Sequence, residues 1–329
     1  MNAWAFIIFG ISAVATYFIA SRLAMYGDGI SEKTKTSSAF IGFIIGIAIS
    51  LPELTASVTS IAIDSPNLAI GNLLGSNLFN LLALAVLDIV FRRNQIMGQT
   101  DEGSKLYVFL VIFMTLIVIG GLSFSPSGQL FHIGYSSIVL VLVYVGGVKW
   151  INRRTEEQVK RKSRRNEKYG NYSYRTMLTR FILFAVLITM IGTSLTISAD
   201  RIADITGLGT SFIGSFLVGA STSLPDAVSV LTAIKLRNYS MGVSSLLGSN
   251  AFNIMLLSFT DAIYLNNSLF NYASPSNLVT SSATVVVTLV LLYSITRKKR
   301  RSTLLYVTPP LLIVGIYIVS TWAVYMLKG

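Results

Sequence analysis

The feature that most constrains the fold is a short motif that occurs twice, each time inside an apolar segment. Residues 50–53 read Ser-Leu-Pro-Glu within the run from about Phe40 to Ile63, and residues 223–226 read Ser-Leu-Pro-Asp within a second run. A carboxylate at the centre of a membrane helix is costly, so it usually marks an ion or proton path. Proline removes one backbone donor and frees a carbonyl about a turn earlier. One copy would also fit a kinked helix with a tolerated carboxyl, whereas two matched copies favour a cation site.

The two motifs belong to a longer internal repeat. A shift of 173 residues aligns the two halves without a gap and gives 15 identities between residues 43–84 and their partners. Within this repeat, residues 75–80 (Gly-Ser-Asn-Leu-Phe-Asn) meet residues 248–253 (Gly-Ser-Asn-Ala-Phe-Asn). The Ser and the last Asn of each copy are four residues apart and share a helix face. Such residues also serve as packing between helices, but their recurrence beside a matched carboxylate favours a binding role.

The composition indicates a membrane protein with several spans. Hydrophobic residues make up 53% of the 329-residue chain and charged residues only 12%, against about a quarter in soluble domains. A membrane helix needs about 20 mainly apolar residues, and the N-terminal run fits a first helix better than a cleaved signal peptide. The ten predicted spans are approximately Ala3–Met25, Ser37–Ile63, Leu68–Phe91, Leu106–Leu122, Leu130–Trp150, Met177–Ala199, Thr210–Ile234, Met241–Ile263, Leu278–Thr296 and Leu304–Leu327.

The positive charges predict the orientation of these helices. In the ten-helix arrangement, 24 of the 26 Lys and Arg residues fall in or beside alternate connections, and the exceptions are Arg201 and Lys328. Cytoplasmic loops carry such an excess, so we expect a multi-pass protein of the cell membrane with both termini outside. The net charge of +12 then belongs to loops beside anionic lipid and gives no reason to expect nucleic acid.

The repeat and the helix count together predict inverted halves. We expect an N-terminal half over residues 1–151, a basic cytoplasmic loop over 152–175 and a C-terminal half over 176–329. Five helices per half is an odd number, so the two halves enter the membrane in opposite directions. Inverted repeats with interrupted helices place an ion site near the midplane, where the halves meet. The predicted fold class is therefore an all-α polytopic membrane protein with two inverted five-helix repeats.

The polar side chains expected at that depth are all hard oxygen donors. Carboxylate, amide and hydroxyl oxygens suit Ca²⁺, Mg²⁺, Mn²⁺ or Na⁺ better than Zn²⁺ or copper. Two carboxylates neutralise one divalent ion, which lowers the cost of holding it in a medium of low dielectric constant. The candidates are Glu53 and Asp226, Asn80 and Asn253, and the hydroxyls of Ser50, Ser76, Thr222, Ser223 and Ser249.

These motifs resemble those of the calcium/cation antiporter superfamily, which includes the sodium/calcium exchangers. The resemblance rests on two alpha-repeats, about residues 42–84 and 215–257, and the ten-helix layout extends it over nearly the whole chain. It implies antiport of Ca²⁺ or a similar divalent cation for Na⁺ by alternating access, with helices 1 and 6 sliding across the other eight. It also implies a central Ca²⁺ site at Glu53, Asn80, Asp226 and Asn253. Flanking Na⁺ positions would be lined by Ser50, Ser76, Thr222, Ser223 and Ser249.

Three departures from the family pattern bear on the counter-ion. Ile49 stands where the first repeat usually carries a threonine hydroxyl, and Asn253 stands where the second repeat often carries aspartate. Asp226 replaces the glutamate of many sodium/calcium exchangers and resembles the potassium-dependent branch. Three Na⁺ ions against two carboxylates would leave excess positive charge, so the alternatives are fewer Na⁺ ions per Ca²⁺, coupling to H⁺, or dependence on K⁺.

Other classes of function are less well supported. A cation channel usually gains its symmetry from oligomers rather than from inverted halves of one chain. A membrane enzyme would need a nucleophile–base pair or a metal-binding cluster, whereas the chain has one His and no Cys. We therefore expect a transporter with no cofactor, whose partners are the bilayer and the transported ions. The oligomeric state, including a monomer, is left open.

Overall fold

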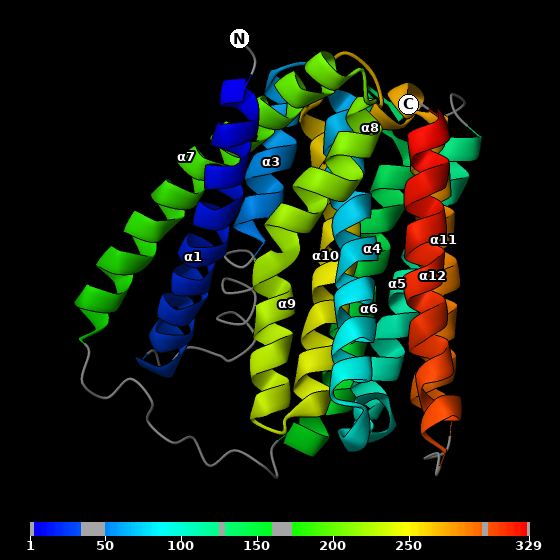
Figure 1. Cartoon of the computed structure of the whole chain (residues 1–329). Helices are drawn as coiled ribbons and strands as arrows, with labels where there is room; N and C mark the ends of the chain where they lie inside the picture. The colour runs from blue at the N-terminus through cyan, green and yellow to red at the C-terminus, as the bar shows by residue number, and fades with distance from the viewer. Residues whose placement is uncertain (1–2, 34–49, 125–128, 160–172, 298–301, 328–329) are drawn as a thin grey trace.

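The described part of the chain folds into a bundle of long helices. The computed structural model describes residues 3–33, 50–124, 129–159, 173–297 and 302–327 (Figure 1). In chain order the elements are α1 (Ala3–Lys33), α3 (Leu51–Ala62), α4 (Pro66–Val90), the 3₁₀ turns η1 (Arg92–Asn94) and η2 (Ile96–Gln99), α5 (Glu102–Ser123), the paired antiparallel strands β1 (Gln129–Leu130) and β2 (Ile133–Gly134), α6 (Tyr135–Val159), α7 (Tyr174–Thr206), α8 (Thr210–Phe212), the π-helical stretch η3 (Ile213–Val218), α9 (Gly219–Lys235), α10 (Tyr239–Ile263), the 3₁₀ turn η4 (Leu269–Tyr272), α11 (Pro275–Thr296) and α12 (Thr303–Leu327).

The predicted class of an all-α polytopic membrane protein is confirmed. Within the described residues, nine helical segments are long and apolar enough to cross a membrane. The tenth predicted span, Ser37–Ile63, lies partly outside these residues, and α3 is its described portion. Ile49 and the repeat residues before Ser50 are likewise outside them.

Most predicted boundaries agree with the structure to within a few residues, and the main differences have local causes. Helix α7 is longer than predicted because Ser173 caps its N-terminus by accepting a hydrogen bond from the Thr176 amide, and Gly207 ends it at φ +67°. Helix α6 begins at Tyr135 because the β1–β2 hairpin precedes it, and it continues to Val159, into the segment predicted as a loop.

The two prolines of the repeated motif differ in their effect. Pro52 lies in the first turn of α3, where its missing N–H removes no intrahelical bond, so the predicted interruption coincides with a helix start. Pro225 lies inside α9, which is continuous from Gly219 to Lys235, so the interruption predicted at Pro225-Asp226 is wrong. The irregularity lies earlier, in the π-helical stretch η3, where Gly214 and Ser215 lie against the backbone of α4.

The internal repeat governs the structure beyond the sequence motifs. Helices α4 and α10 have the same bounds when displaced by 173 residues, and so do α5 and α11. The turns that precede α4 and α10 each contain a left-handed residue at matched positions, Asp64 at φ 53° and Arg237 at φ 58°. The matched helices run in opposite directions through the bundle (Figure 1), so the repeats are inverted.

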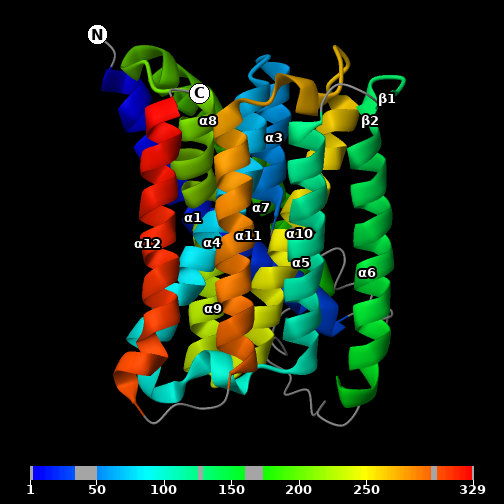
Figure 2. The ribbon, with the colours of Figure 1, turned by 90° about the vertical axis from the view of Figure 1, so that its right-hand side faces the viewer.

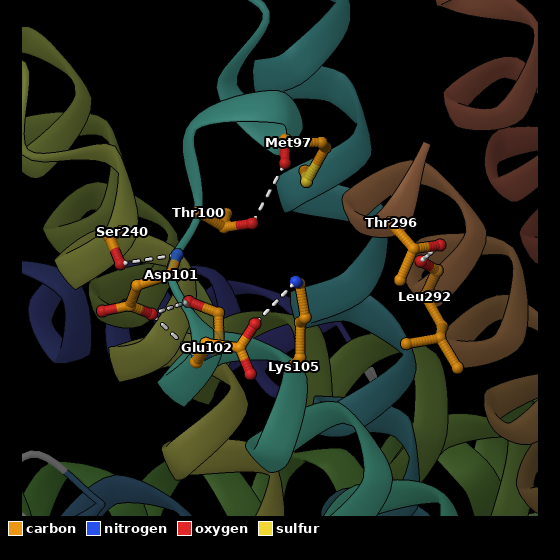
Figure 3. A network of polar contacts seen from close by, with 9 residues as sticks. Met97, Thr100, Asp101, Glu102, Lys105, Ser240, Leu292 and Thr296 are labelled. Atoms are coloured by element: carbon orange, nitrogen blue, oxygen red, sulfur yellow. Dashed lines mark hydrogen bonds and ion pairs between the residues drawn. The ribbon is translucent and has the colours of Figure 1, made fainter. Parts of the chain in front are cut away.

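Hydrogen bonds at matched positions join the N-cap of α5 to α10 and the N-cap of α11 to α4. The Asp101 amide, at the N-cap of α5, donates to Ser240 Oγ in α10 at 3.2 Å, and the Ser104 amide donates to Asp101 Oδ1 at 2.9 Å (Figure 3). In the other half, the Ser274 amide, at the N-cap of α11, donates to Asn67 Oδ1 in α4 at 2.7 Å. Equivalent positions therefore make equivalent bonds at opposite ends of the bundle.

The N-cap carboxylate of α5 is held in its charged form. Burial raises the pKa of Asp101, but hydrogen bonds from Ser240 and Ser104 lower it by more, so the pKa lies below its ordinary value. A negative charge at this end of the helix is favoured by the partial positive charge of the helix N-terminus.

Helices α1 and α7 form an outer pair on one side of the bundle. They pack along each other and against α3 and α9, whereas α4, α10, α5 and α11 lie beyond (Figures 1 and 2). At the end of the bundle that carries the N-terminus of α1, an apolar cluster joins this pair to the rest. We call it the neutral-end cluster; its buried members are Ala5, Ala56, Leu68, Leu195, Ala199, Ile202, Ala203, Ile213 and Val218.

Small residues let the backbone of η3 and α9 lie directly on α4. A Cβ added at Gly75 would lie 2.0 Å from the Ser215 carbonyl oxygen, and one added at Gly219 would lie 2.7 Å from the Ser76 amide nitrogen. Neither position has room for a side chain, because the obstructing atoms belong to the backbone. This close approach sets the spacing between the two helices that carry much of the site described below.

We predict that Gly75→Ala destabilises the protein strongly, by about 2 kcal/mol or more, because overpacking against backbone cannot relax easily. Gly248 is its repeat equivalent, and a Cβ there would meet only the Tyr107 ring at 3.8 Å among the described residues. Gly248→Ala is therefore the matched control and should change stability by less than about 1 kcal/mol. Thermal unfolding in detergent measures both, and equal losses would contradict the close packing described for Gly75.

Candidate cation site

Four helices supply the polar residues at the centre of the bundle, α3 and α4 from one repeat and α9 and α10 from the other. Glu53 lies in the first turn of α3 and is 1% exposed. The positive end of the α3 dipole stabilises a carboxylate at this position. Asp226 lies within α9 and is 8% exposed. Glu53 Oε1 accepts a hydrogen bond from Ser223, which belongs to the same motif as Asp226, so the structure brings the two repeated motifs together.

Asp226 is held by two donors from the long helices. Asn80 Nδ2 in α4 donates to Asp226 Oδ2 at 3.1 Å, and Ser249 Oγ in α10 donates to the same oxygen at 2.6 Å. The Asn80 amide also donates to Asn250 Oδ1 at 3.0 Å. Residues from both repeats therefore surround this carboxylate.

Glu53 has fewer partners. Ser223 Oγ donates to Glu53 Oε1 at 3.3 Å, which links α9 to α3. Asn72 Nδ2 donates to the Glu53 carbonyl oxygen and to Ser57 Oγ, each at 3.2 Å, and so fixes the backbone of the first turn of α3. The described salt bridges, Lys105–Glu102 and Arg201–Asp204, lie elsewhere at helix ends.

The hydroxyls beside the acids form a small connected group. Ser76 Oγ and Thr222 Oγ1 both donate to the Gly219 carbonyl oxygen at 3.3 Å, and the two hydroxyls lie 3.4 Å apart. Thr222 Oγ1 also lies 3.3 Å from Asn72 Oδ1. This group joins α4 to α9 next to the carboxylates.

Several buried oxygens at the site accept no hydrogen bond from the part of the chain that the structure describes. They are Glu53 Oε2, Asn77 Oδ1, Asn80 Oδ1 and Asn253 Oδ1. A buried acceptor without a donor costs about 1–3 kcal/mol. The four oxygens come from α3, α4 and α10 and are carboxylate and amide oxygens, the kinds of ligand that Ca²⁺ prefers.

The structure thus gathers most of the residues that the sequence predicted. Hydrogen bonds connect Glu53, Ser223, Thr222 and Ser76 into one group through Asn72 and Gly219. A second group consists of Asn80, Asp226 and Ser249. Asn253 is fully buried in α10, and its amide makes no hydrogen bond with a described residue. Ser50 is buried at the N-cap of α3, and its side chain does not cap that helix.

Three further asparagines in the site were missed by sequence reasoning. Asn77 and Asn250 donate to each other's carbonyl oxygens, Asn77 Nδ2 at 3.2 Å and Asn250 Nδ2 at 3.1 Å. Both stand in the middle of the repeated Gly-Ser-Asn motif, a signal that was present in the sequence. Asn72 had no such signal, because its repeat equivalent is Ser245.

Other buried acids lie apart from this site. Asp88 in α4 accepts a hydrogen bond from the Tyr306 hydroxyl, and Asp261 in α10 accepts from the Gly134 amide and the Ser137 hydroxyl. His132 contacts the Ala262 carbonyl oxygen at 2.9 Å. No group of three or more His, Cys, Asp and Glu side chains occurs among the described residues, so the central site combines two carboxylates with amides and hydroxyls.

The fold and the site define a polytopic membrane protein with inverted repeats and an oxygen-lined site at their junction. The profile of the sodium/calcium exchanger protein family matches residues 4–150 and 177–326. The chain belongs to this family of membrane cation exchangers.

Individual relatives are distant but match over most of their length. The uncharacterized membrane protein MJ0091 of Methanocaldococcus jannaschii is 22% identical over 248 residues, which is 75% of this chain and 77% of that protein. The H⁺/Ca²⁺ exchanger CAX matches with a TM-score of 0.65 and 14% identity over 98% of this chain and 88% of its own. The sodium-calcium exchanger NCX_Mj matches with a TM-score of 0.57 and 20% identity over 97% and 98%. The two structures share the fold of this chain.

We predict that Asn72→Ala lowers the free energy of unfolding by about 2–4 kcal/mol, because it removes several hydrogen bonds at once and leaves buried partners unsatisfied. Ser245 is the repeat equivalent and is exposed, so Ser245→Ala is the matched control and should stay within about 0.5 kcal/mol. Denaturation in detergent micelles compares the two. A loss in Asn72→Ala no larger than in the control would contradict its role between α3, α4 and α9.

Proposed function

We propose that the protein is a secondary antiporter that exchanges Ca²⁺, or a similar divalent cation, for a monovalent cation by alternating access. In this proposal residues 1–151 and 176–329 act as two inverted halves, joined by the basic segment 152–175. Glu53, Asn80, Asp226 and Asn253 bind the divalent cation. The flanking hydroxyls of Ser50, Ser76, Thr222, Ser223 and Ser249 bind the counter-ion or support the ligands. Transport needs no chemical step, so the protein acts as a carrier and requires no cofactor.

The four buried oxygens without donors are the observation that carries this proposal. They come from both repeats, one of them belongs to Glu53 itself, and neither Glu53 nor Asp226 takes part in a described salt bridge. A divalent cation would supply the missing partners and balance two negative charges, which makes the burial of both acids tolerable. The length and flexibility of these side chains suit Ca²⁺, which accepts six to eight oxygens in varied geometry.

We propose further that the protein exchanges fewer Na⁺ ions for each Ca²⁺ than exchangers with three acids at the site, or that it exchanges protons instead of Na⁺. Two carboxylates cannot balance three Na⁺ ions, and Asn253 supplies no third charge. The solved relatives include one exchanger of H⁺ and one of Na⁺ by their names, so both counter-ions occur on this fold.

The distribution of charge supports an orientation with the basic loops in the cytoplasm. Helices α4, α9 and α11 end on the same side of the bundle (Figure 1). Positive residues stand at or just after these ends, namely Arg92, Arg93, Lys235, Arg237 and Arg297, and positive residues favour the cytoplasmic side. The proposal therefore places both termini outside the cell, in the cell membrane, at the end that carries the neutral-end cluster.

Uptake of radiolabelled Ca²⁺ into proteoliposomes under separate Na⁺, K⁺ and H⁺ gradients tests the function and the counter-ion. We expect an outward-directed H⁺ gradient, or a Na⁺ gradient with low cooperativity, to drive uptake well above the level without a gradient. Steep and voltage-driven dependence on Na⁺ would contradict the proposed coupling. Absence of gradient-driven uptake of Ca²⁺ and of Sr²⁺ and Mn²⁺ would contradict divalent antiport.

We predict that Glu53→Gln lowers the apparent affinity for Ca²⁺ roughly 10- to 100-fold, because it removes a charged ligand worth about 1.5–3 kcal/mol. The variant should still fold, since glutamine retains the shape of the side chain and an acceptor for Ser223. Asp204→Asn, which alters an exposed acid at the end of α7, is the control and should transport normally. Wild-type Ca²⁺ dependence of transport in Glu53→Gln would remove Glu53 from the site.

A further inference from the structure

The two halves of the site are related by the repeat, but their hydrogen bonds differ. Under the 173-residue shift, Asn80 is equivalent to Asn253, Glu53 to Asp226 and Asn77 to Asn250. In one half, the Asn80 amide nitrogen donates to Asp226 Oδ2 at 3.1 Å and to Asn250 Oδ1 at 3.0 Å. The equivalent bonds in the other half would run from the Asn253 amide nitrogen to Glu53 and to Asn77.

Neither of those equivalent bonds is formed. Asn253 Nδ2, Glu53 Oε2 and Asn77 Oδ1 are all buried, and each lacks a hydrogen-bond partner among the residues that the structure describes. These are the three atoms that the repeat symmetry would join. In the same conformation, the hydrogen bonds of one half of the network are therefore formed, and the equivalent bonds of the other half are not.

A symmetric pair of bonds holds the two halves together at this point. Asn77 Nδ2 donates to the Asn250 carbonyl oxygen, and Asn250 Nδ2 donates to the Asn77 carbonyl oxygen. We call this pair the asparagine clasp. Because each Nδ2 atom donates to the partner's carbonyl oxygen, the Oδ1 atom of the same side chain must point away from that carbonyl. Asn250 Oδ1 points to Asn80, and Asn77 Oδ1 is left available for Asn253.

Inverted repeats exchange roles when a transporter changes the side to which it opens. We infer that Asn77 and Asn250 are positioning residues that decide which carboxylate is free for the cation. In the conformation described here, Asn250 holds Asn80 against Asp226, and Glu53 is the less encumbered ligand. In the oppositely facing conformation, Asn77 holds Asn253 against Glu53, and Asp226 becomes the freer ligand. This inference rests on the proposed alternating-access function.

We therefore expect substitutions of Asn77 and of Asn250 to shift the balance between the two conformations in opposite directions. Asn250→Ala removes the acceptor for Asn80 and so weakens the present conformation. Asn77→Ala removes the acceptor for Asn253 and so weakens the opposite one. Each substitution also removes one bond of the clasp itself, and this loss is the same in both variants. A role in packing alone would therefore affect the two variants alike.

A single introduced cysteine can report a change in the populations of the two conformations, because the chain itself contains no cysteine. Ala199 in α7 is fully buried in the neutral-end cluster, so Ala199→Cys should react with a maleimide only when that end opens. The full-length protein would be labelled in detergent without added Ca²⁺. One hydrogen bond corresponds to a population change of roughly 2- to 10-fold. We expect Asn250→Ala to raise the labelling rate by this factor and Asn77→Ala to lower it by a similar factor.

Changes in the same direction, or no change in either variant, would overturn the inference. Thermal unfolding and size-exclusion chromatography verify that each variant is folded. If an alanine variant does not fold, Asn77→Ser and Asn250→Ser shorten the side chain below the reach of the neighbouring amide and give the same test. Ca²⁺ uptake by the wild-type protein in proteoliposomes separates the two proposals. Uptake without opposite labelling shifts overturns the clasp inference alone, and opposite shifts without uptake overturn the proposed function alone.

Discussion

Two acidic side chains buried at the depth of the bilayer impose the main constraint on this structure. The bilayer core offers no hydrogen bonds, so polar groups there must be satisfied from within the protein or by an ion. Asp226 is satisfied by Asn80 and Ser249, both on the long helices α4 and α10. Glu53 is only partly satisfied, by Ser223. The packing of α3, α4, α9 and α10 therefore serves to bring compensating groups to these two carboxylates.

The close approach of backbones is a second consequence of this constraint. Short side chains such as Asn80 and Ser76 reach across to the other repeat only if the helices lie close together. Gly75 and Gly219 permit that approach, because a side chain at either position would collide with backbone atoms of the facing helix. The π-helical stretch η3 belongs to the same interface, since Ser215 within it lies against Gly75. Local geometry and the location of the site are thus connected.

The unequal halves of the site connect the structure to transport. Pseudo-symmetry gives two equivalent carboxylates, yet only Asp226 is bonded to an asparagine amide in this conformation. A carrier that binds the same cation from either side needs two states of similar energy that differ in access. A network in which the hydrogen bonds of only one half are formed provides such a pair of states, because the same residues can form the bonds of the other half instead. The asparagine clasp is the element that the two states would share.

The sequence predicted the fold class, and it named most of the residues that the candidate site brings together, because the repeat carried the information. A shift that aligned residues 50–53 with 223–226 also aligned the bounds of α4 with α10 and of α5 with α11. The interruption at Pro225 was predicted wrongly, because α9 continues through this proline, and the irregular turns lie instead in η3, which has no sequence signature. Asn72 was missed because its role depends on distant residues such as Thr222 and Ser57. Asn77 and Asn250 were visible in the repeated motif, but their mutual bonds became evident only in three dimensions.

The most direct test of the central claim is an experimental structure of the protein soaked in Sr²⁺, located by its anomalous scattering as a substitute for Ca²⁺. The account predicts one strong peak between α3, α4, α9 and α10, with the ion at about 2.3–2.6 Å, or slightly more, from Glu53 Oε2 and from an asparagine oxygen of α4 or α10. A structure with Sr²⁺ bound only elsewhere, or with Glu53 and Asp226 on opposite sides of an ion-free, apolar junction, would contradict it.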